Sequence, residues 1–390
     1  MILNIICKLL ILCCFCYSFK FRKLPINKQN IMTSFASSPS THISTDIIRS
    51  LRNLVKRDDN SIDWNKLEQF IRDKAENSYK NWQQTSLWAD QLESIIGSPT
   101  DQMFQDIFER VLIDGNWYGA LEKSKSEHHN WIVLVTGLNG IRKTTSIYQP
   151  WFKSVLQEAL GDALSDDAAL IDSLPIGQNS FFRQLDFMIA TLANENFRTL
   201  YSKTNSLSTS EYSSQKDIIF KNYRTIAEIL GILLLRSAQK TSINALVETS
   251  GRDIAMFDYV DHLYSDKEFK KLVLHFSIND IRFAEQSVDT RMDAEMKKGM
   301  IASIANEGMV DYRAIVQVNA GGPYGSQVLR GVQADSDKVW DQVVKDETRN
   351  DWLKASILIN GNDNPAEWSV QAILPNGKIS PNKYYFLKDI

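Results

Sequence analysis

The segment that most constrains the fold of this 390-residue chain is an apolar run that breaks into a glycine-rich turn and then a helix. Residues 131–135, Trp-Ile-Val-Leu-Val, predict a buried strand. The turn contains Gly137 and Gly140 and continues into Lys-Thr-Thr. Because a strand that is apolar on both faces needs helices on both sides of its sheet, this segment predicts an α/β fold with a parallel sheet.

Alternating helices and strands continue between residues 126 and 310, and this pattern supports a single α/β domain over that range. Its first strand is the apolar run at residues 131–135. Further strands are expected at residues 168–172, 244–248 and 272–278, and helices at residues 148–160, 181–204, 210–240 and 281–306.

Two regions flank this domain. Residues 46–125 carry apolar residues at helical spacing, with Asp63 placed to cap one helix, and predict an N-terminal helical region. Residues 311–390 predict a small β-rich C-terminal extension, or antiparallel strands that extend the main sheet. Its expected elements are strands at residues 314–319, 355–359, 368–374 and 384–387, a helix near 340–354 and a turn at 375–378.

Residues 1–45 have the composition of a targeting segment. Residues 2–17 are almost wholly apolar but fall short of the roughly 20 residues that span a bilayer. Residues 18–45 are basic, rich in Ser and Thr, and free of acids. The order resembles the two-part plastid presequence of algae with secondary plastids, which implies plastid import and no stable membrane span after processing. A secretory signal, a membrane anchor and a working start at Met32 are the alternatives.

Charge and cysteine usage exclude several classes of function. The net charge is −3, and residues 1–45 hold five bases and no acid, so the remainder is near −8. A body this acidic is not expected to bind nucleic acid. All four cysteines lie in the first 16 residues, and the five histidines lack metal-ligand spacing. The body therefore has no cysteine nucleophile or disulfide, and we expect no zinc site.

The turn after the first strand matches the phosphate-binding pattern G-x-x-x-x-G-K-[ST] at all but one position. Glycines let backbone N–H groups turn toward phosphate oxygens, and the helix that follows presents its positive end. Lys143 is placed to reach the outer phosphates, and Thr144 to offer its hydroxyl to Mg²⁺. We expect a nucleotide to bind at this glycine loop, which consists of Gly137, Leu138, Asn139, Gly140, Ile141, Arg142, Lys143, Thr144 and Thr145.

Arg142 stands where the pattern has its second glycine. A non-glycine residue at positive φ costs roughly 1–2 kcal/mol, and this side chain could also crowd the phosphates. Alternatively, Arg142 adds a cation beside the γ-phosphate and acts as a built-in arginine finger. We favour the finger, which makes Arg142 a catalytic candidate.

Two acids are candidates for the chemistry at this loop. Glu248 ends the expected strand at residues 244–248 and precedes Thr-Ser-Gly, a position suited to hold Mg²⁺ with Thr144 or to orient the nucleophile. Asp172 ends the expected strand at residues 168–172 and could take the proton of an acceptor hydroxyl. Arg183 could line the acceptor site. The alternative for each acid is a carboxylate in an ordinary turn.

Arg282 and Arg291 lie on the expected helix at residues 281–306. They are catalytic candidates because arginines on a mobile lid neutralise a transferring phosphoryl group. Acids on the same helix could instead pair with them on a solvated face. We expect that alternative for one of the two arginines.

Together, the glycine loop, Asp172, Glu248-Thr249-Ser250 and the arginine-bearing helix resemble the group of P-loop kinases that includes zeta-toxin-like kinases. The resemblance covers about residues 131–306. It implies an ATP- and Mg²⁺-dependent phosphotransferase that acts on a hydroxyl of a small molecule or nucleotide. It does not identify the acceptor or indicate an oligomeric state.

Two other interpretations stay open. The glycine loop with Glu248-Thr249-Ser250-Gly251-Arg252 is also similar to signal-recognition-particle GTPases, which carry an N-terminal helical domain. Two features argue against these GTPases: Glu248 replaces an Asp, and no guanine-reading Thr-Lys-x-Asp motif follows. We therefore prefer an adenine nucleotide to a guanine nucleotide. A nucleotide-binding pseudoenzyme whose terminal regions bind a partner is the third interpretation, supported mainly by Arg142.

Overall fold

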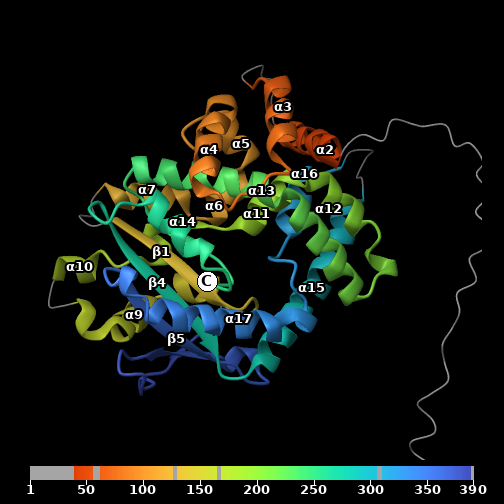
Figure 1. Ribbon diagram of the computed structural model, residues 1–390. Coiled ribbons are helices and arrows are strands. Elements are labelled where there is room, and N and C mark those ends of the chain that lie inside the picture. Colours follow the sequence, from red (N-terminus) through yellow and green to blue (C-terminus); the bar gives the residue numbers. More distant parts are fainter. Residues whose placement is uncertain (1–38, 56–61, 126–129, 165–167, 305–309, 388–390) are drawn as a thin grey trace, which may run out of the picture. The chain divides into compact units, whose positions relative to one another are not determined.

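The apolar run forms β1, an internal strand of the sheet with parallel neighbours on both sides (Figure 1). The computed structural model describes residues 39–55, 62–125, 130–164, 168–304 and 310–387. Within them the sheet has seven strands in the order β2-β3-β1-β4-β5-β6-β7. Their bounds are β1 Asn130–Gly137, β2 Ser180–Arg183, β3 Asn244–Glu248, β4 Phe269–Ile278, β5 Leu353–Asn360, β6 Ser369–Ile373 and β7 Tyr384–Tyr385.

Strands β2, β3, β1, β4 and β5 run parallel, while β6 and β7 are antiparallel to their neighbours. The expected α/β fold with a mostly parallel sheet is therefore confirmed. The chain passes from β1 to the edge strand β2, returns to β3, and then crosses β1 to reach β4. The winding direction changes beside β1, which is where open α/β sheets bind ligands at the carboxyl ends of their strands.

The side chains of β1 alternate between two hydrophobic cores, one on each face of the sheet. Ile132 and Leu134 pack into a core that includes α13 (Thr209–Lys240) and the N-terminal helices. Val133 and Val135 pack into a second core with α9 (Phe152–Leu160) and the C-terminal strands. All four side chains are fully buried, so an apolar residue is needed at every position.

The region before β1 is helical, as its apolar spacing predicts. Asp63 caps the second helix, where its carboxylate accepts a hydrogen bond from the backbone N–H of Lys66 at 2.9 Å. These helices share the core of α13 and belong to the same compact unit as the sheet. They are α2 Pro39–Leu54, α3 Trp64–Lys74, α4 Trp82–Ile96, α5 Gln102–Ile107, α6 Glu109–Asp114 and α7 Trp117–Ser124.

Helix α2 begins at Pro39, before the expected end of the targeting segment at residue 45. Ser44 and Ile47 are fully buried, so the last residues of that segment belong to the folded unit. Residues 1–38 lie outside the described residues, and their targeting role stays a prediction. Among the described helices, none combines the length and apolar character needed to cross a membrane.

The remaining helices cover the two faces of the sheet, with α9 and α17 near the strands β4 and β5 in Figure 1. They are α8 Lys143–Tyr148, α10 Ala168–Asp172, α11 Leu185–Leu192, α12 Asn194–Tyr201, α14 Ala255–Leu263, α15 Ile281–Ser303, α16 Tyr312–Val318 and α17 Ser326–Val344. Short 3₁₀ turns lie at Gly161–Leu164, Gly177–Asn179, Thr204–Ser206, Glu347–Arg349 and Pro365–Glu367.

The predicted strand at residues 168–172 is wrong, because this segment forms α10. A run of four apolar residues fits a helix or a strand, and periodicity cannot separate the two. The second strand is instead β2, inside the stretch 181–204 that was expected to be helical. All four residues of β2 are buried, and it pairs in parallel with β3.

Two assignments near the C-terminus are also wrong. Residues 314–319 fall in α16, whose first turn is capped by the Asp311 carboxylate. The helix expected near 340–354 lies earlier, as α17, and β5 already begins at Leu353. Of the two alternatives for this region, extension of the main sheet is the one observed. β5 adds to it in parallel, and β6 follows antiparallel.

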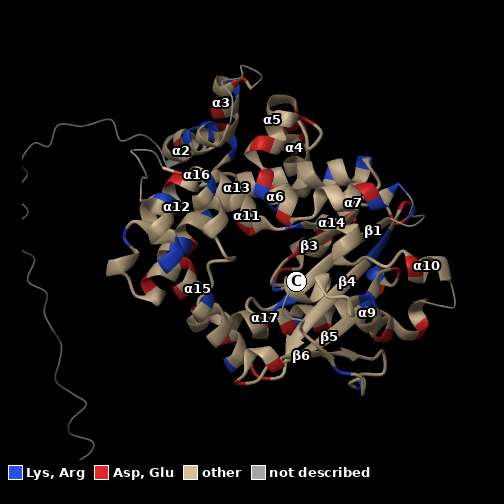
Figure 2. Ribbon diagram, turned by 180° about the vertical axis from the view of Figure 1, so that it is seen from behind, with Lys and Arg blue, Asp and Glu red and all other residues tan. Residues whose placement is uncertain are grey.

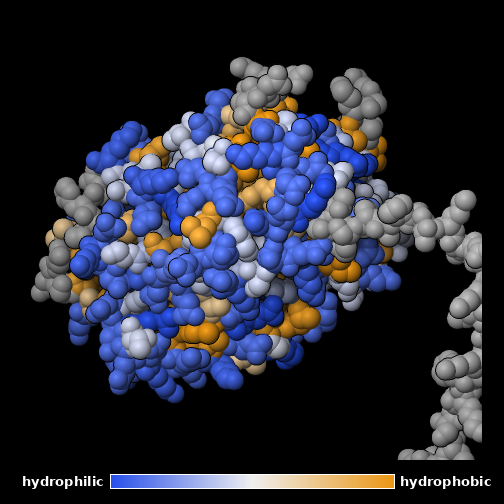
Figure 3. Space-filling model, turned by 45° about the horizontal axis from the view of Figure 1, so that its top comes forward, coloured by the Kyte–Doolittle hydropathy of each residue, from blue (hydrophilic) through white to orange (hydrophobic). Residues whose placement is uncertain are grey.

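Charged side chains lie mainly on the helices around the sheet (Figure 2). The face seen in Figure 3 is largely hydrophilic, with apolar residues in separate small patches. Scattered apolar surface residues of this kind are ordinary in folded domains.

A buried ion cluster connects β2 to α13. Glu228 of α13 is fully buried and pairs with Arg183 at the end of β2 and with Arg224 one turn earlier. Arg183 is 1% exposed and passes over Gly231, where an added Cβ atom would collide with its guanidinium. A glycine in the middle of a long helix is thus explained by the close approach of a charged side chain.

We expect Gly231→Ala to destabilise the protein by about 1–3 kcal/mol, because the new methyl group displaces Arg183 from Glu228. The matched control is Gly331→Ala in α17, where an added Cβ atom meets nothing within 4 Å. There, alanine should stabilise the helix by about 1 kcal/mol. Urea unfolding measures both variants, and stabilisation by Gly231→Ala would contradict the packing described here.

Candidate functional site

The glycine loop connects the carboxyl end of β1 to α8, and three of its residues have positive φ. These are Gly137 at 122°, Gly140 at 84° and Arg142 at 60°. An added Cβ atom at Gly137 would collide with the carbonyl oxygen of Phe276 in β4, and one at Gly140 would lie 2.6 Å from Val288 Cγ1 in α15. Both glycines are therefore required by close packing as well as by backbone conformation.

The loop presents a run of free hydrogen-bond donors. In the part of the chain that the structure describes, the backbone N–H groups of residues 139–145 have no hydrogen-bond acceptor. The first amide after them to donate is that of Ser146, to the carbonyl of Arg142 at 2.9 Å. Successive free N–H groups in a turn of this kind form a concave site suited to an anion.

Lys143 is 4% exposed and closes over the loop. Its ammonium group donates to the carbonyls of Gly137 at 2.9 Å and Leu138 at 2.7 Å. It also lies 3.1 Å from Oε1 of Glu248, at the end of β3. The parallel pairing of Val135 with Glu248 creates this contact, because it brings the ends of β1 and β3 together.

The helix after the loop is shorter than the sequence suggests. The stretch expected as one helix at 148–160 is divided, since α8 ends at Tyr148 and α9 begins at Phe152. Pro150 explains the break, because proline disfavours helical conformation in the residue before it. Gln149 is indeed extended, with ψ of 143°. A six-residue helix contributes little dipole, so the loop amides and Lys143 carry most of the positive potential.

Arg142 adopts the left-handed conformation, as its position in the pattern predicts. Its guanidinium lies 4.5 Å from the ring centroid of Trp368 and 5.1 Å from that of Phe386, both in the C-terminal region. Burial lowers the pKa of this guanidinium. The side chain thus has aromatic partners, and the geometry gives no support to a built-in arginine finger.

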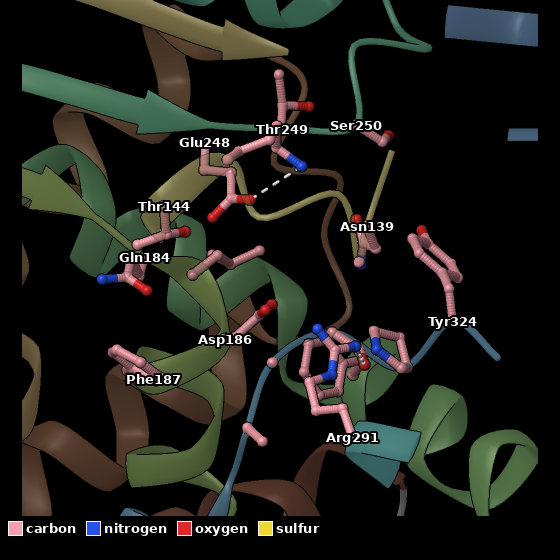
Figure 4. Close-up of a pocket in the computed structure, with 18 of the residues that line it drawn as sticks. Asn139, Thr144, Gln184, Asp186, Phe187, Glu248, Thr249, Ser250, Arg291 and Tyr324 are labelled. Carbon is pink, nitrogen blue, oxygen red and sulfur yellow. Dashed lines mark hydrogen bonds and ion pairs between the residues drawn. The ribbon is translucent and has the colours of Figure 1, made fainter. Parts of the chain in front are cut away.

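Beside the loop lies a cavity of about 660 Å³. Figure 4 shows Thr144, Glu248 and Asp186 on one side of it, and Arg291 and Tyr324 on the other. Its walls come from the glycine loop, β3, α11, α13, α15 and the segment before α17. The lining residues are Tyr79, Asn139, Gly140, Arg142, Lys143, Thr144, Thr145, Gln184, Leu185, Asp186, Phe187, Asp217, Phe220, Lys221, Arg224, Glu248, Thr249, Ser250, Arg252, Ser287, Arg291, Ala320, Gly321, Gly322, Pro323 and Tyr324.

Asp172 does not line this cavity. It lies on α10, with 83% of its side chain exposed, and pairs with Lys153 at 3.3 Å. The next residue, Ser173, accepts a hydrogen bond from the indole of Trp131 at the amino end of β1, opposite to the glycine loop. The expectation that Asp172 receives a proton at the site is therefore wrong, because the second strand was assigned to the wrong segment.

Asp186 occupies the place that was expected for Asp172. It follows β2 in the first turn of α11 and lines the cavity. Burial, with a smaller contribution from the charge of Glu248, raises its pKa to about 6. The sequence does contain a sign of this strand, the apolar pair Phe181-Phe182 shortly before Asp186. The helical periodicity of the residues that follow favours a helix instead.

The two arginines of α15 have different positions. Arg282 has a 72% exposed side chain and pairs with Asp280, the residue that caps the helix. Arg291 lines the cavity, and its Nε is buried without a partner among the described residues. Its Nη2 donates to the carbonyl of Gly322 at 3.4 Å. Arg291 is thus the arginine at the site, and Arg282 belongs to the solvated face.

The segment before α17 closes the cavity over the glycine loop. An added Cβ atom at Gly322 would lie 2.7 Å from the side-chain Nδ2 of Asn139, so the two segments are in close contact. A hydrogen bond holds this segment to α15, where the backbone N–H of Ala320 donates to Glu295 at 3.0 Å. Glu295 is itself buried and pairs with Lys216 at 2.8 Å. The buried ion pair of Glu295 and Lys216 therefore helps to position the segment before α17.

The fold thus brings together the glycine loop, Glu248, Arg291 and Asp186, and leaves out Asp172, Arg282 and Arg183. No family model matches the chain, and no curated protein matches it either. The interpretation of the site therefore depends on its residues and geometry.

The raised pKa of Asp186 predicts a pH-dependent stability. Between about pH 4 and pH 6 the folded protein keeps a proton that the unfolded chain releases, so rising pH lowers the free energy of unfolding. Asp186→Asn removes this loss. As pH rises across that interval, the free energy of unfolding of the variant should increase relative to wild type by on the order of 3 kcal/mol. Above about pH 6 the difference should stay constant. Parallel stability curves for the two proteins would contradict the raised pKa.

Proposed function

We propose that this protein is a Mg²⁺-dependent phosphotransferase that uses ATP to phosphorylate a hydroxyl of a small molecule or nucleotide. The observation that carries the proposal is the run of unpaired N–H groups at residues 139–145 beside the buried Lys143. Polyphosphate is the anion for which this arrangement is best suited, because successive amides contact successive phosphate oxygens.

The residues present fit a magnesium ion bound together with a nucleotide. Thr144 and Glu248 both line the cavity next to Lys143 and offer one hydroxyl and one carboxylate. Mg²⁺ is usually held by one or two protein oxygens together with phosphates and water, so a larger cage of protein ligands is not needed. When bound, the ion would neutralise charge on the β- and γ-phosphates.

Asp186 is the residue that we assign as proton acceptor in the proposed transfer. With a pKa of about 6 it is ionised at neutral pH and close enough to neutrality to accept a proton. As the acceptor oxygen forms its bond to the γ-phosphorus, its proton would pass to Asp186. The bond from phosphorus to the bridging oxygen breaks, and its electron pair stays on ADP.

Arg291 is the cation best placed to stabilise charge on the transferring group. Its Nε lacks a partner among the described residues, and no carboxylate pairs with its guanidinium there. A preorganised cation of this kind lowers the energy of the transition state more than that of the ground state.

We expect Lys143→Ala to abolish Mg·ATP binding, because the variant loses the cation that we propose contacts the outer phosphates. Isothermal titration with Mg·ATP and with Mg·GTP measures the effect and the base preference. Unchanged affinity in Lys143→Ala would contradict the placement of the nucleotide. Stronger binding of GTP would favour the GTPase alternative, and binding without turnover would favour the pseudoenzyme.

Turnover should depend on Asp186 and not on Asp172. Asp186→Asn is expected to slow phosphoryl transfer by about 10²-fold or more while ATP affinity changes little. Asp172→Asn is the matched control, because it makes the same change on an exposed helix outside the cavity. The assay is ADP release with a metabolite extract as the source of acceptor. Equal rates for the two variants would show that Asp186 is not the base.

A further inference from the structure

We propose that the acceptor carries an anionic group, a phosphate or a carboxylate, which binds at a basic wall of the cavity formed by Lys221, Arg224 and Arg252. The acceptor would then be a small anionic alcohol. The hydroxyl half of this statement rests on the proposed phosphotransferase function, whereas the anion site rests on the charge and geometry of the wall.

Arg224 shares its one ion-pair partner among the described residues with a second arginine. Glu228 is the only carboxylate that the structure places in ion-pair contact with Arg224 among the described residues, and Glu228 also pairs with Arg183. Arg183 and Glu228 are almost completely buried, whereas the Arg224 side chain is 33% exposed and lines the cavity. Two guanidinium groups that share one carboxylate have one excess positive charge. Arg224 is the one of the two that lines the cavity.

Arg252 is a second arginine without an acidic partner within the described chain. Its guanidinium contacts the hydroxyl of Tyr324 and lies 4.9 Å from the centroid of that ring. Lys221 adds a third cation. Its side chain is 73% exposed and, within the ranges that the structure describes, pairs only with Asp217. Exposed pairs of this kind hold their charges weakly, so Lys221 stays available to a ligand.

These cations form one wall and do not lie apart. Lys221 and Arg224 lie three residues apart on α13, and both line the cavity together with Arg252 and its partner Tyr324. Asp186 lines the same cavity, so the wall and the proposed base face the space that an acceptor would occupy. An alcohol whose anion binds this wall would therefore bring its hydroxyl to the base.

The wall is built to recognise a planar or tetrahedral anion. Arg224 is held by two contacts to Glu228, at 2.8 Å from Nε and 2.7 Å from Nη2, and its guanidinium lies 5.4 Å from the ring centroid of Tyr79. A guanidinium that is already immobilised loses little entropy when it binds phosphate or carboxylate. The cavity volume of about 660 Å³ is within the usual range for small-molecule sites.

The test is calorimetric titration of inorganic pyrophosphate into the full-length protein saturated with Mg·AMP-PNP, a non-hydrolysable ATP analogue that occupies the glycine loop. We expect one further equivalent of pyrophosphate to bind. Arg224→Gln and Arg252→Gln should each weaken this binding about tenfold or more. Arg236→Gln is the matched control, since Arg236 lies on the same helix but pairs with Asp90 outside the cavity.

A second arm replaces pyrophosphate with malonate, and binding of either anion with this arginine dependence supports the proposal. Arg224→Gln leaves a neutral buried pair and should fold; if it does not, the exposed Arg252 gives an independent measurement. The proposal is overturned if neither anion binds, or if Arg236→Gln weakens binding equally. If AMP-PNP fails to bind but the arginine-dependent anion site remains, the phosphotransferase function fails and the anion site stands.

Discussion

The close contact between Gly137 and the carbonyl oxygen of Phe276 determines where the chain leaves the sheet, and the site depends on that point. β1 pairs with β4 up to this residue, and the loop then turns between β4 and α15. Gly140 meets Val288 of α15 within the same turn. Beyond Gly137, the backbone N–H groups of residues 139–145 have no acceptor among the described residues, and most of this segment lines the cavity.

The charges around the cavity are arranged so that each serves a separate part of the site. Lys143 is buried but paired with Glu248, which keeps an ammonium group at the loop without a large desolvation cost. For Asp186, burial and the charge of Glu248 raise the pKa, so its charged form is disfavoured. Arg224 shares its Glu228 partner with Arg183, and Arg252 has no carboxylate partner among the described residues, so the excess of positive charge supports the proposed anionic ligand.

Arg142 connects the glycine loop to the C-terminal strands. Its left-handed backbone costs roughly 1–2 kcal/mol, and stacking on two aromatic rings is worth about 0.5–2 kcal/mol, so the two effects largely offset one another. Trp368 and Phe386 are both buried in the core that α9 shares with β6. The C-terminal extension therefore contacts the glycine loop through Arg142.

The sequence alone determined the central strand, the glycine loop, Glu248 at the end of β3 and the mostly parallel sheet, because each depends on local patterns of apolar and glycine residues. Only the tertiary structure showed that Asp186 and not Asp172 reaches the loop, since a four-residue strand inside a helical stretch is defined by its pairing with β3. It likewise separated Arg291 from Arg282 and turned Arg142 toward Trp368. Those outcomes depend on contacts between segments that are far apart in the sequence, and the spacing of residues along the chain does not predict such contacts.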